Sequence, residues 1–420
     1  MQADYLILIV LGALLILSPL VKSLMERMGV PALVGYILLG FIVSVIDQQW
    51  SFITTAFDNT FAILAQLGVV ALLFRVGLKS HTKALLAKLP DASTIWIGDV
   101  LTNLLFGFVV SYYTLSLSLE ASLIIAAAFS ATSVAVSVTV WDELNKLNTS
   151  TGQLLLDVAE LDDLSGVLLL AVLIAIIPVL QSDETALLSS MGITTFVVLV
   201  KLTLFITGCY LFSHYLEFGF TQFNRQWEDS KTGLTNSVLG AGLAIAAVAG
   251  YLGFSLAIGA LFAGLAFSRD PRAVHTDAKF VYFYEFLTPF FFIYIGMQVN
   301  PGIVASSFGL AAILFVPAVL GKFLGVAIPA LRIVKQRNAI LLGLSMIPRA
   351  EIAMVIVYQC HQLGGGIVSD NIFGAVILMS VMTSIAASLA RISHQDHGSR
   401  RRIRVRKRRS GAKSVAIATV

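Results

Sequence analysis

The sequence predicts an all-α polytopic membrane protein with about thirteen transmembrane helices. Hydrophobic residues make up 57% of the 420 residues and charged residues only 12%, whereas a typical soluble protein has roughly 25% charged residues. The mean hydropathy is +0.88, and the 32 glycines fit membrane helices, which pack closely through small residues. The length is therefore better counted in membrane spans than in soluble domains.

Apolar runs follow one another along most of the chain. Most of them have the length of roughly 17–25 residues that crosses a bilayer as a helix. They lie at 5–21, 30–46, 61–78, 93–115, 120–141, 152–178, 191–213, 233–249, 252–267, 280–298, 303–331, 338–360 and 368–390. No basic segment precedes the first run and no small-residue cleavage site follows it, so we expect a retained span rather than a signal peptide.

The basic residues of the loops predict the orientation. When the connections are assigned alternately to the two sides, one set holds 24 of the 28 lysines and arginines and the other set holds none. Lys and Arg accumulate on the cytoplasmic side, so we expect the amino terminus outside and the carboxyl terminus in the cytoplasm. The four others lie inside predicted spans, where Arg75 and Lys201 can extend their charge towards the membrane surface: Arg75, Lys201, Lys322 and Arg349.

The last segment, 396–420, is strongly basic. Directly after a membrane span, such a segment anchors to anionic lipid or enforces the topology. We therefore expect a basic cytoplasmic tail and no binding of nucleic acid.

Adjacent carboxylates inside an apolar run are the most informative feature. Asp162 and Asp163 precede an apolar stretch that reaches Pro178, and an ionised carboxylate at mid-membrane costs about 2.5–3.5 kcal/mol on insertion scales. Neighbours on a helix point about 100° apart, so the two carboxylates are expected to serve different partners. Asp157 and Glu160 lie nearer the helix end. The alternative is that Asp162 and Asp163 are also solvated there.

Lys322 is the expected counter-ion for one of these aspartates. Its neighbours on both sides are apolar or glycine for several residues. A buried lysine beside a carboxylate can gain and lose a proton. The alternative is a lysine that extends to the membrane surface and only orients its helix.

A proline interrupts the twelfth apolar run. Pro348 lacks a backbone donor and bends or breaks a helix. Arg349 and Glu351 follow it, too close in sequence to share a helical face, so each is expected to pair elsewhere: Arg349 with Glu160 or Asp157. The alternative is a purely structural kink with a supporting ion pair.

Hydroxyl residues interrupt the fifth apolar run at Ser130, Thr132 and Ser133. Their oxygens are ligands for hard cations, although Ser and Thr also serve helix packing in membranes. The runs with the hydroxyls and the aspartates, and those with the lysine and the proline, belong to two triplets of opposite orientation. Inverted triplets with broken helices at the midplane are the recurrent design of secondary transporters.

These segments together resemble the monovalent cation/proton antiporter superfamily, in particular its bacterial sodium/proton and potassium/proton exchangers. The resemblance covers roughly residues 5–390 and rests on Thr132-Ser133, Asp162-Asp163, the Gly-Lys-Phe-Leu-Gly segment at 321–325 and the Pro-Arg-Ala-Glu segment at 348–351. Two departures concern the pairing of Arg349. The family usually has glycine where this chain has Ala350, and Glu160 stands where an apolar residue is common.

The resemblance implies a homodimer in which a mobile core moves against a dimer scaffold. It also implies that the fifth and twelfth helices are unwound where they cross, that Asp163 binds the cation and the proton, and that Asp162 pairs with Lys322. The expected boundaries are 1–395 for the transporter domain, 93–178 and 303–390 for its core, and 5–78 and 233–298 for its scaffold.

The resulting hypothesis is an antiporter with one site for two competing ions, which needs no cofactor. Deprotonated Asp163, helped by Asp162, Thr132, Ser133 and unwound carbonyls, binds sodium, or lithium or potassium, and a proton displaces it. The site then crosses the membrane, expected to be a bacterial inner membrane, only when it is loaded. If Lys322 also exchanges a proton, two protons move per cation.

Two alternatives come from other functional classes. A potassium efflux or channel-like transporter would share the cation ligands. An intramembrane aspartyl protease would need two aspartates on different helices, one of them in a Gly-x-Gly-Asp setting; the segment Trp96–Asp99 lacks the first glycine.

Overall fold

The computed structural model describes residues 2–79, 82–133, 137, 141, 146–147, 149–180, 187–227, 231–268, 273–364 and 366–386. Within these residues every regular element is a helix and none is a strand, which confirms the predicted all-α class. Six described helices are long and apolar enough to cross a membrane, and four shorter helices are apolar. The total number of spans stays a prediction. The basic tail, 396–420, lies outside the described residues.

The helices of the first half lie on the predicted apolar runs, with bounds that differ at the ends; α5 stops eleven residues before the end of its run, 120–141. They are α1 (Gln2–Arg27), α2 (Ala32–Trp50), α3 (Thr55–Lys79), α4 (Thr82–Val109) with the π-helical turn η1 (Val110–Thr114), α5 (Leu119–Ser130) and α7 (Ser150–Leu180).

The second half continues in the same way. Its helices are α8 (Leu187–Leu211), the π-helical turn η2 (Phe212–Leu216), α9 (Glu217–Trp227), α10 (Lys231–Tyr251), α11 (Leu256–Phe267), α12 (Ala273–Gln298), η3 (Pro301–Ile303), α13 (Val304–Ala330), α14 (Gln336–Ser345), α15 (Glu351–Gln362) and a last apolar helix, Asp370–Ala386. The predicted division of the run pair at 233–267 is present as the turn between α10 and α11.

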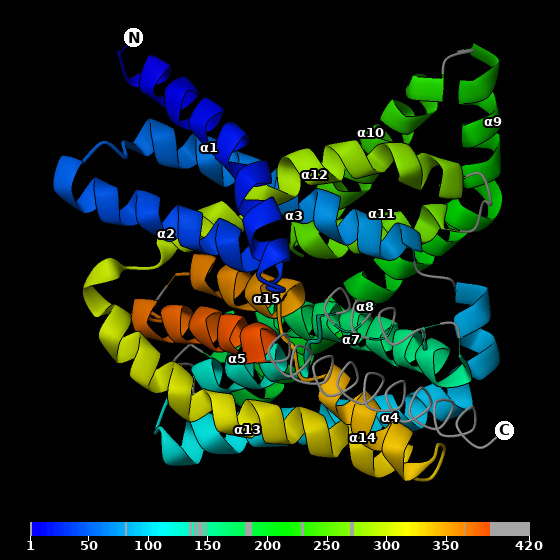
Figure 1. Ribbon diagram of the computed structural model, residues 1–420. Helices are drawn as coiled ribbons and strands as arrows, with labels where there is room; N and C mark the ends of the chain where they lie inside the picture. Colours follow the sequence, from blue (N-terminus) through cyan, green and yellow to red (C-terminus); the bar gives the residue numbers. More distant parts are fainter. Residues whose placement is uncertain are drawn as a thin grey trace, which may run out of the picture.

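The helices form two groups (Figure 1). In the first, α3 packs against α11 and α12, and α12 packs against α2. In the second, α4 packs against α13, α5 and α7, and α15 packs against α5 and α7. Of the helices in the predicted scaffold ranges, α2, α3, α11 and α12 lie in the first group, and of those in the predicted core ranges, α4, α5, α7, α13 and α15 lie in the second. The division into a mobile core and a dimer scaffold stays a prediction.

Glycines bring α4 and α13 into close contact. A Cβ atom on Gly325 would lie 2.9 Å from the Cα atom of Asp99, and one on Gly98 would lie 2.5 Å from the Cγ atom of Pro329. Such distances leave no room for a larger residue, and small residues at helix crossings are how membrane helices approach each other. The crossing places Asp99 of α4 beside Lys322 of α13.

Two predicted transmembrane helices are interrupted at the point where they contact each other. The fifth apolar run leaves helical geometry after Ser130, and Ala131 is extended. The twelfth run stops being helical between Ser345 and Glu351, because Pro348 donates no backbone hydrogen bond. The Ser133 amide donates to the Pro348 carbonyl over 2.8 Å. The predicted pair of crossed, broken helices is therefore present.

Candidate functional site

Lys322 is completely buried and its ammonium group is fully hydrogen bonded. Nζ donates to Oδ2 of Asp162 over 2.6 Å, to Oδ2 of Asp99 over 2.5 Å and to the Ser130 carbonyl over 2.6 Å. A lysine ammonium has three donors, so all three are used. The expected Asp162–Lys322 ion pair is present, and the expected alternative of a lysine reaching the surface does not apply.

Asp162 takes part in this cluster through one carboxylate oxygen. Thr132 Oγ1 donates to Oδ2 over 2.6 Å, on the same oxygen that Lys322 binds. The other oxygen, Oδ1, is buried and accepts no hydrogen bond from the described residues. Thr132 therefore binds Asp162. The ammonium of Lys322, from α13, and the hydroxyl of Thr132, from the broken fifth helix, together orient this aspartate.

Asp99 is a site residue that sequence reasoning missed. It is completely buried, and it shares Lys322 with Asp162. Asn103, one turn further along α4, donates from Nδ2 to Oδ1 of Asp99 over 2.6 Å. The signal was an acid and an amide four residues apart inside the apolar run 93–115. In the sequence, Asp99 stands out only as part of a protease motif that lacks its first glycine.

Arg349 has other partners than those expected. Its Nη2 donates to Oδ1 of Asn103 over 2.6 Å, and its Nε donates to the Phe129 carbonyl over 2.9 Å. Within the described part of the chain, no ion pair joins it to Asp157 or Glu160, so the expectation that Arg349 pairs with one of them is wrong. The physical reason is burial: Arg349 is completely buried, whereas both of those acids are partly exposed.

Four buried charges thus form one neutral cluster. Asp99 and Asp162 supply two negative charges, and Lys322 and Arg349 supply two positive charges; all four side chains have 0% exposure. Buried charges are tolerated when they are paired and hydrogen bonded. The cluster links α4, α7, α13 and the break before α15 into one unit.

Asp163 lies outside this neutral cluster. Its side chain is buried, with 6% exposure, and its Oδ1 accepts no hydrogen bond from the described residues. The acidic groups that interact electrostatically with it include Glu351 and the neighbouring Asp162. Ser133 Oγ donates to Oε2 of Glu351 over 3.3 Å. The two hydroxyls of the predicted Thr132–Ser133 pair therefore bind different acids, Asp162 and Glu351.

Asp157 and Glu160 continue from Asp163 towards the start of α7. The three acids are spaced three residues apart, which places them along one side of a helix. Asp157 and Glu160 are partly exposed, as is Glu351. Partly exposed acids therefore lie on both sides of the buried Asp163, from α7 and from α15.

The arrangement argues against a protease. Asp99 and Asp162 come from different helices, but both bind the ammonium of Lys322, so they cannot share a proton around a water molecule as protease aspartates do. Two broken helices cross in this bundle, beside the paired charges of the Lys322 cluster and beside the buried Asp163. These features define the class of secondary transporters.

This chain belongs to the transmembrane sodium/hydrogen exchanger family. The sequence model of that family matches residues 12–392, nearly the whole described chain. Members of this family are transporters rather than enzymes, and the chain is a cation/proton antiporter of this class.

The chain is similar to several sodium/proton antiporters. The high-affinity Na⁺/H⁺ antiporter NhaS3 of Synechocystis is 26% identical over 79% of this chain and 71% of its own. The Na⁺/H⁺-K⁺ antiporter GerN of Bacillus cereus is 25% identical over 89% of this chain and 92% of its own. The structure of the sodium proton antiporter MjNhaP1 from Methanocaldococcus jannaschii superposes with a TM-score of 0.71, at 17% identity, over 92% of this chain and 96% of that one. At that identity the last comparison shows the fold alone.

Proposed function

We propose that this protein exchanges protons for sodium at one site centred on Asp163. The observation that carries the proposal is a buried carboxylate oxygen, Oδ1 of Asp163, that has no donor among the described residues and lies outside the neutral cluster. A buried anionic oxygen needs a compensating positive charge, which either a proton or a bound cation supplies. The similarity to NhaS3, a Na⁺/H⁺ antiporter, and to GerN, a Na⁺/H⁺-K⁺ antiporter, supports sodium as the cation.

The remaining ligands come from the crossing of the broken helices. Ser133 donates its hydroxyl proton to Glu351, so the lone pairs of its oxygen stay available for a cation. Oxygen ligands suit hard cations such as sodium. We therefore assign Ser133 and Glu351 to the site with Asp163. Thr132 and Asp162 act through the lysine cluster instead.

The proposed mechanism is alternating access between the two helix groups. The core group, which contains the site, moves against the scaffold group, and the scaffold forms a homodimer. The loop charges orient the amino terminus outside and the start of α7 towards the cytoplasm of a bacterial inner membrane. Asp157 and Glu160, which are partly exposed near that end of α7, would then raise the local concentration of cations there through their negative charge.

Lys322 decides the stoichiometry in this proposal. If its proton leaves during the cycle, two protons move per sodium and the exchange carries net charge. Its three acceptors hold the proton in the present geometry, so release requires the cluster to open. Lys322→Ala would then retain partial exchange that is insensitive to the membrane potential.

The test is exchange in proteoliposomes that contain a pH-sensitive dye, with sodium, lithium or potassium added in turn. We expect sodium to drive proton movement in the wild type, with a dependence on a clamped membrane potential if two protons move. Asp163→Asn should abolish it, and Asp370→Asn, which changes an exposed aspartate, should not. Full exchange by Asp163→Asn would refute the site, and a sustained ionic current far faster than exchange would favour a channel.

A further inference from the structure

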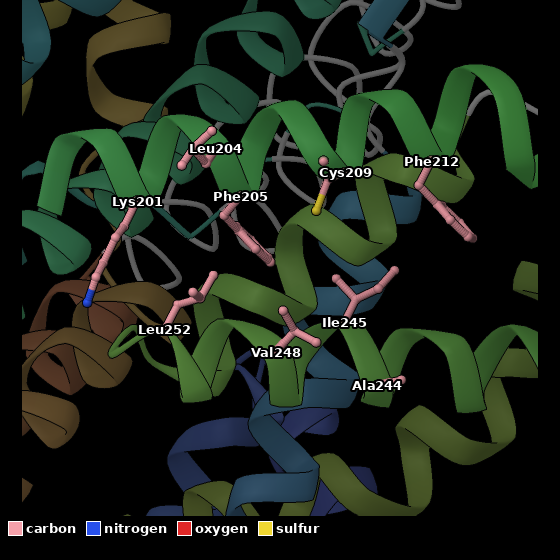
Figure 2. A pocket seen from close by; sticks show the side chains of 10 residues that line it. Lys201, Leu204, Phe205, Cys209, Phe212, Ala244, Ile245, Val248 and Leu252 are labelled. Carbon is pink, nitrogen blue, oxygen red and sulfur yellow. The ribbon is translucent and has the colours of Figure 1, made fainter. Parts of the chain in front are cut away.

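A groove lies between α8 and α10 (Figure 2), and no residue of the charged cluster lines it. Its volume is about 420 Å³, within the range of roughly 300–1,000 Å³ of small-molecule sites. Its lining is apolar except at one end, and includes Leu204 and Phe205 of α8, Phe212 at the start of η2, Ile245 and Val248 of α10, and Leu252 just after α10. Leu204 and Val248 are 66% and 52% exposed, so the groove opens onto the surface of the bundle.

Lys201 stands at one end of this groove. Figure 2 shows its side chain extending past Leu252, at the opposite end from Phe212 and Ala244. The side chain is exposed, and no ion pair joins it to any other described residue. A cation in an otherwise apolar part of a membrane protein needs an anionic partner.

The depth of Lys201 in the membrane follows from the turn beside it. Leu252 is the first residue after α10, and the backbone at 252–255 is not helical. Non-helical backbone does not face hydrocarbon, because its polar groups would lack partners. Tyr251, which is 93% exposed, fits the aromatic belt at the headgroup level. The Lys201 end of the groove therefore lies at the headgroup level, and the apolar part lies beneath it.

We propose that the groove binds one anionic phospholipid from the leaflet on the side of the α10–α11 turn. The lipid phosphate accepts a hydrogen bond from the Lys201 ammonium, and an acyl chain lies between Leu204 and Val248. The charge of Lys201 complements the headgroup, and the lining complements the chain. Since α8 packs on both α7 and α11, the lipid contacts a helix that touches both helix groups.

Native mass spectrometry of the full chain tests this proposal with two probes that have the same acyl chains: dioleoylphosphatidylglycerol and dioleoylphosphatidylcholine. We expect the wild type to prefer the anionic lipid by about fivefold, the effect of one basic residue near a charged lipid surface. Lys201→Gln should lose the preference. Lys22→Gln should keep it, because Lys22 is already paired with Glu285 over 2.9 Å.

A second pair of variants tests the groove itself. A Cβ atom on Gly208, which lines the groove, or on Gly12 of α1 meets no other atom within 4 Å, so both positions accept a larger residue. Gly208→Phe should fill the groove and abolish retention of the anionic lipid, and Gly12→Phe should leave it unchanged. An unchanged preference in Lys201→Gln, or unchanged retention in Gly208→Phe, would overturn the proposal. A shift from dimer to monomer in both Lys201→Gln and Gly208→Phe, without a change in lipid binding, would also overturn it. The groove would then contact a second copy of the chain instead of a lipid.

Discussion

Replacing Asp99 by asparagine tests the buried charge cluster most sharply. The substitution keeps the size of the side chain and removes one of the two negative charges that balance Lys322 and Arg349. The ammonium of Lys322 keeps Asp162 and the Ser130 carbonyl as acceptors, but the buried cluster gains a net positive charge. Because it is completely buried, water cannot compensate for this charge.

The size of the effect follows from that geometry. Removing one partner of a buried ion pair costs about 3–5 kcal/mol, and we expect about 3 kcal/mol because Asp162 still pairs with the lysine. At roughly 2 °C per kcal/mol for a large domain, the melting temperature should fall by about 6 °C. Asp91→Asn, at an exposed position of the same helix, is the control and should leave the melting temperature unchanged.

The double variant Asp99→Asn/Lys322→Met separates charge balance from lost packing. It leaves Asp162 opposite Arg349, so the cluster is neutral again, and its loss of stability should be smaller than the sum of the two single losses by about 1–3 kcal/mol. Thermal unfolding in detergent, followed by tryptophan fluorescence, measures all four proteins. Additive losses, or an Asp99→Asn variant as stable as the wild type, would refute the cluster as an electrostatic unit.

Three further predictions concern transport in proteoliposomes. Glu351→Gln should raise the apparent KM for sodium by about tenfold or more, since an interaction with a charged group contributes about 1.5–3 kcal/mol. The control Glu285→Gln, at the surface, should leave the KM unchanged. An unchanged KM in Glu351→Gln would exclude Glu351 as a sodium ligand. Gly325→Leu should abolish exchange, because the larger side chain forces α4 away from α13. Gly309→Leu on the same helix should stay active, because a Cβ atom there meets no other atom within 4 Å. Equal activity of the two variants would contradict the close crossing of α4 and α13. In the pH range where Asp163 is protonated without sodium, each unit of rising pH should lower the apparent KM about tenfold, because a proton must leave before the cation binds; a KM independent of pH would exclude competition.

Much of the fold could be predicted because its signals are local. Run length, loop charge and Pro348 each constrain the chain within a few residues. The break in the fifth helix was less visible, because it depends on a contact between Ser133 and the Pro348 carbonyl, which are more than 200 positions apart. Only the resemblance to antiporters indicated that break.

The pairings of the site were harder to predict than its residues. Lys322 was expected to pair with one acid and pairs with two, Asp162 and Asp99. The second partner was missed because the sequence does not show that Gly98 and Gly325 bring α4 close to α13. Arg349 was assigned to acids that are close to the aspartates in sequence, but its burial selects the Asn103 amide and the Phe129 carbonyl. Charge patterns identify which groups need partners, and packing decides which partner each receives.

The most direct measurement of the central claim is the number of protons released when sodium binds. Sodium is added to purified protein in weakly buffered detergent solution that contains a pH indicator, at a pH where the cation-free site is protonated. The account predicts about one proton released per sodium bound from the Asp163 site, and none from Asp163→Asn. Sodium binding without proton release across the whole pH range, or the same release from Asp163→Asn, would contradict it.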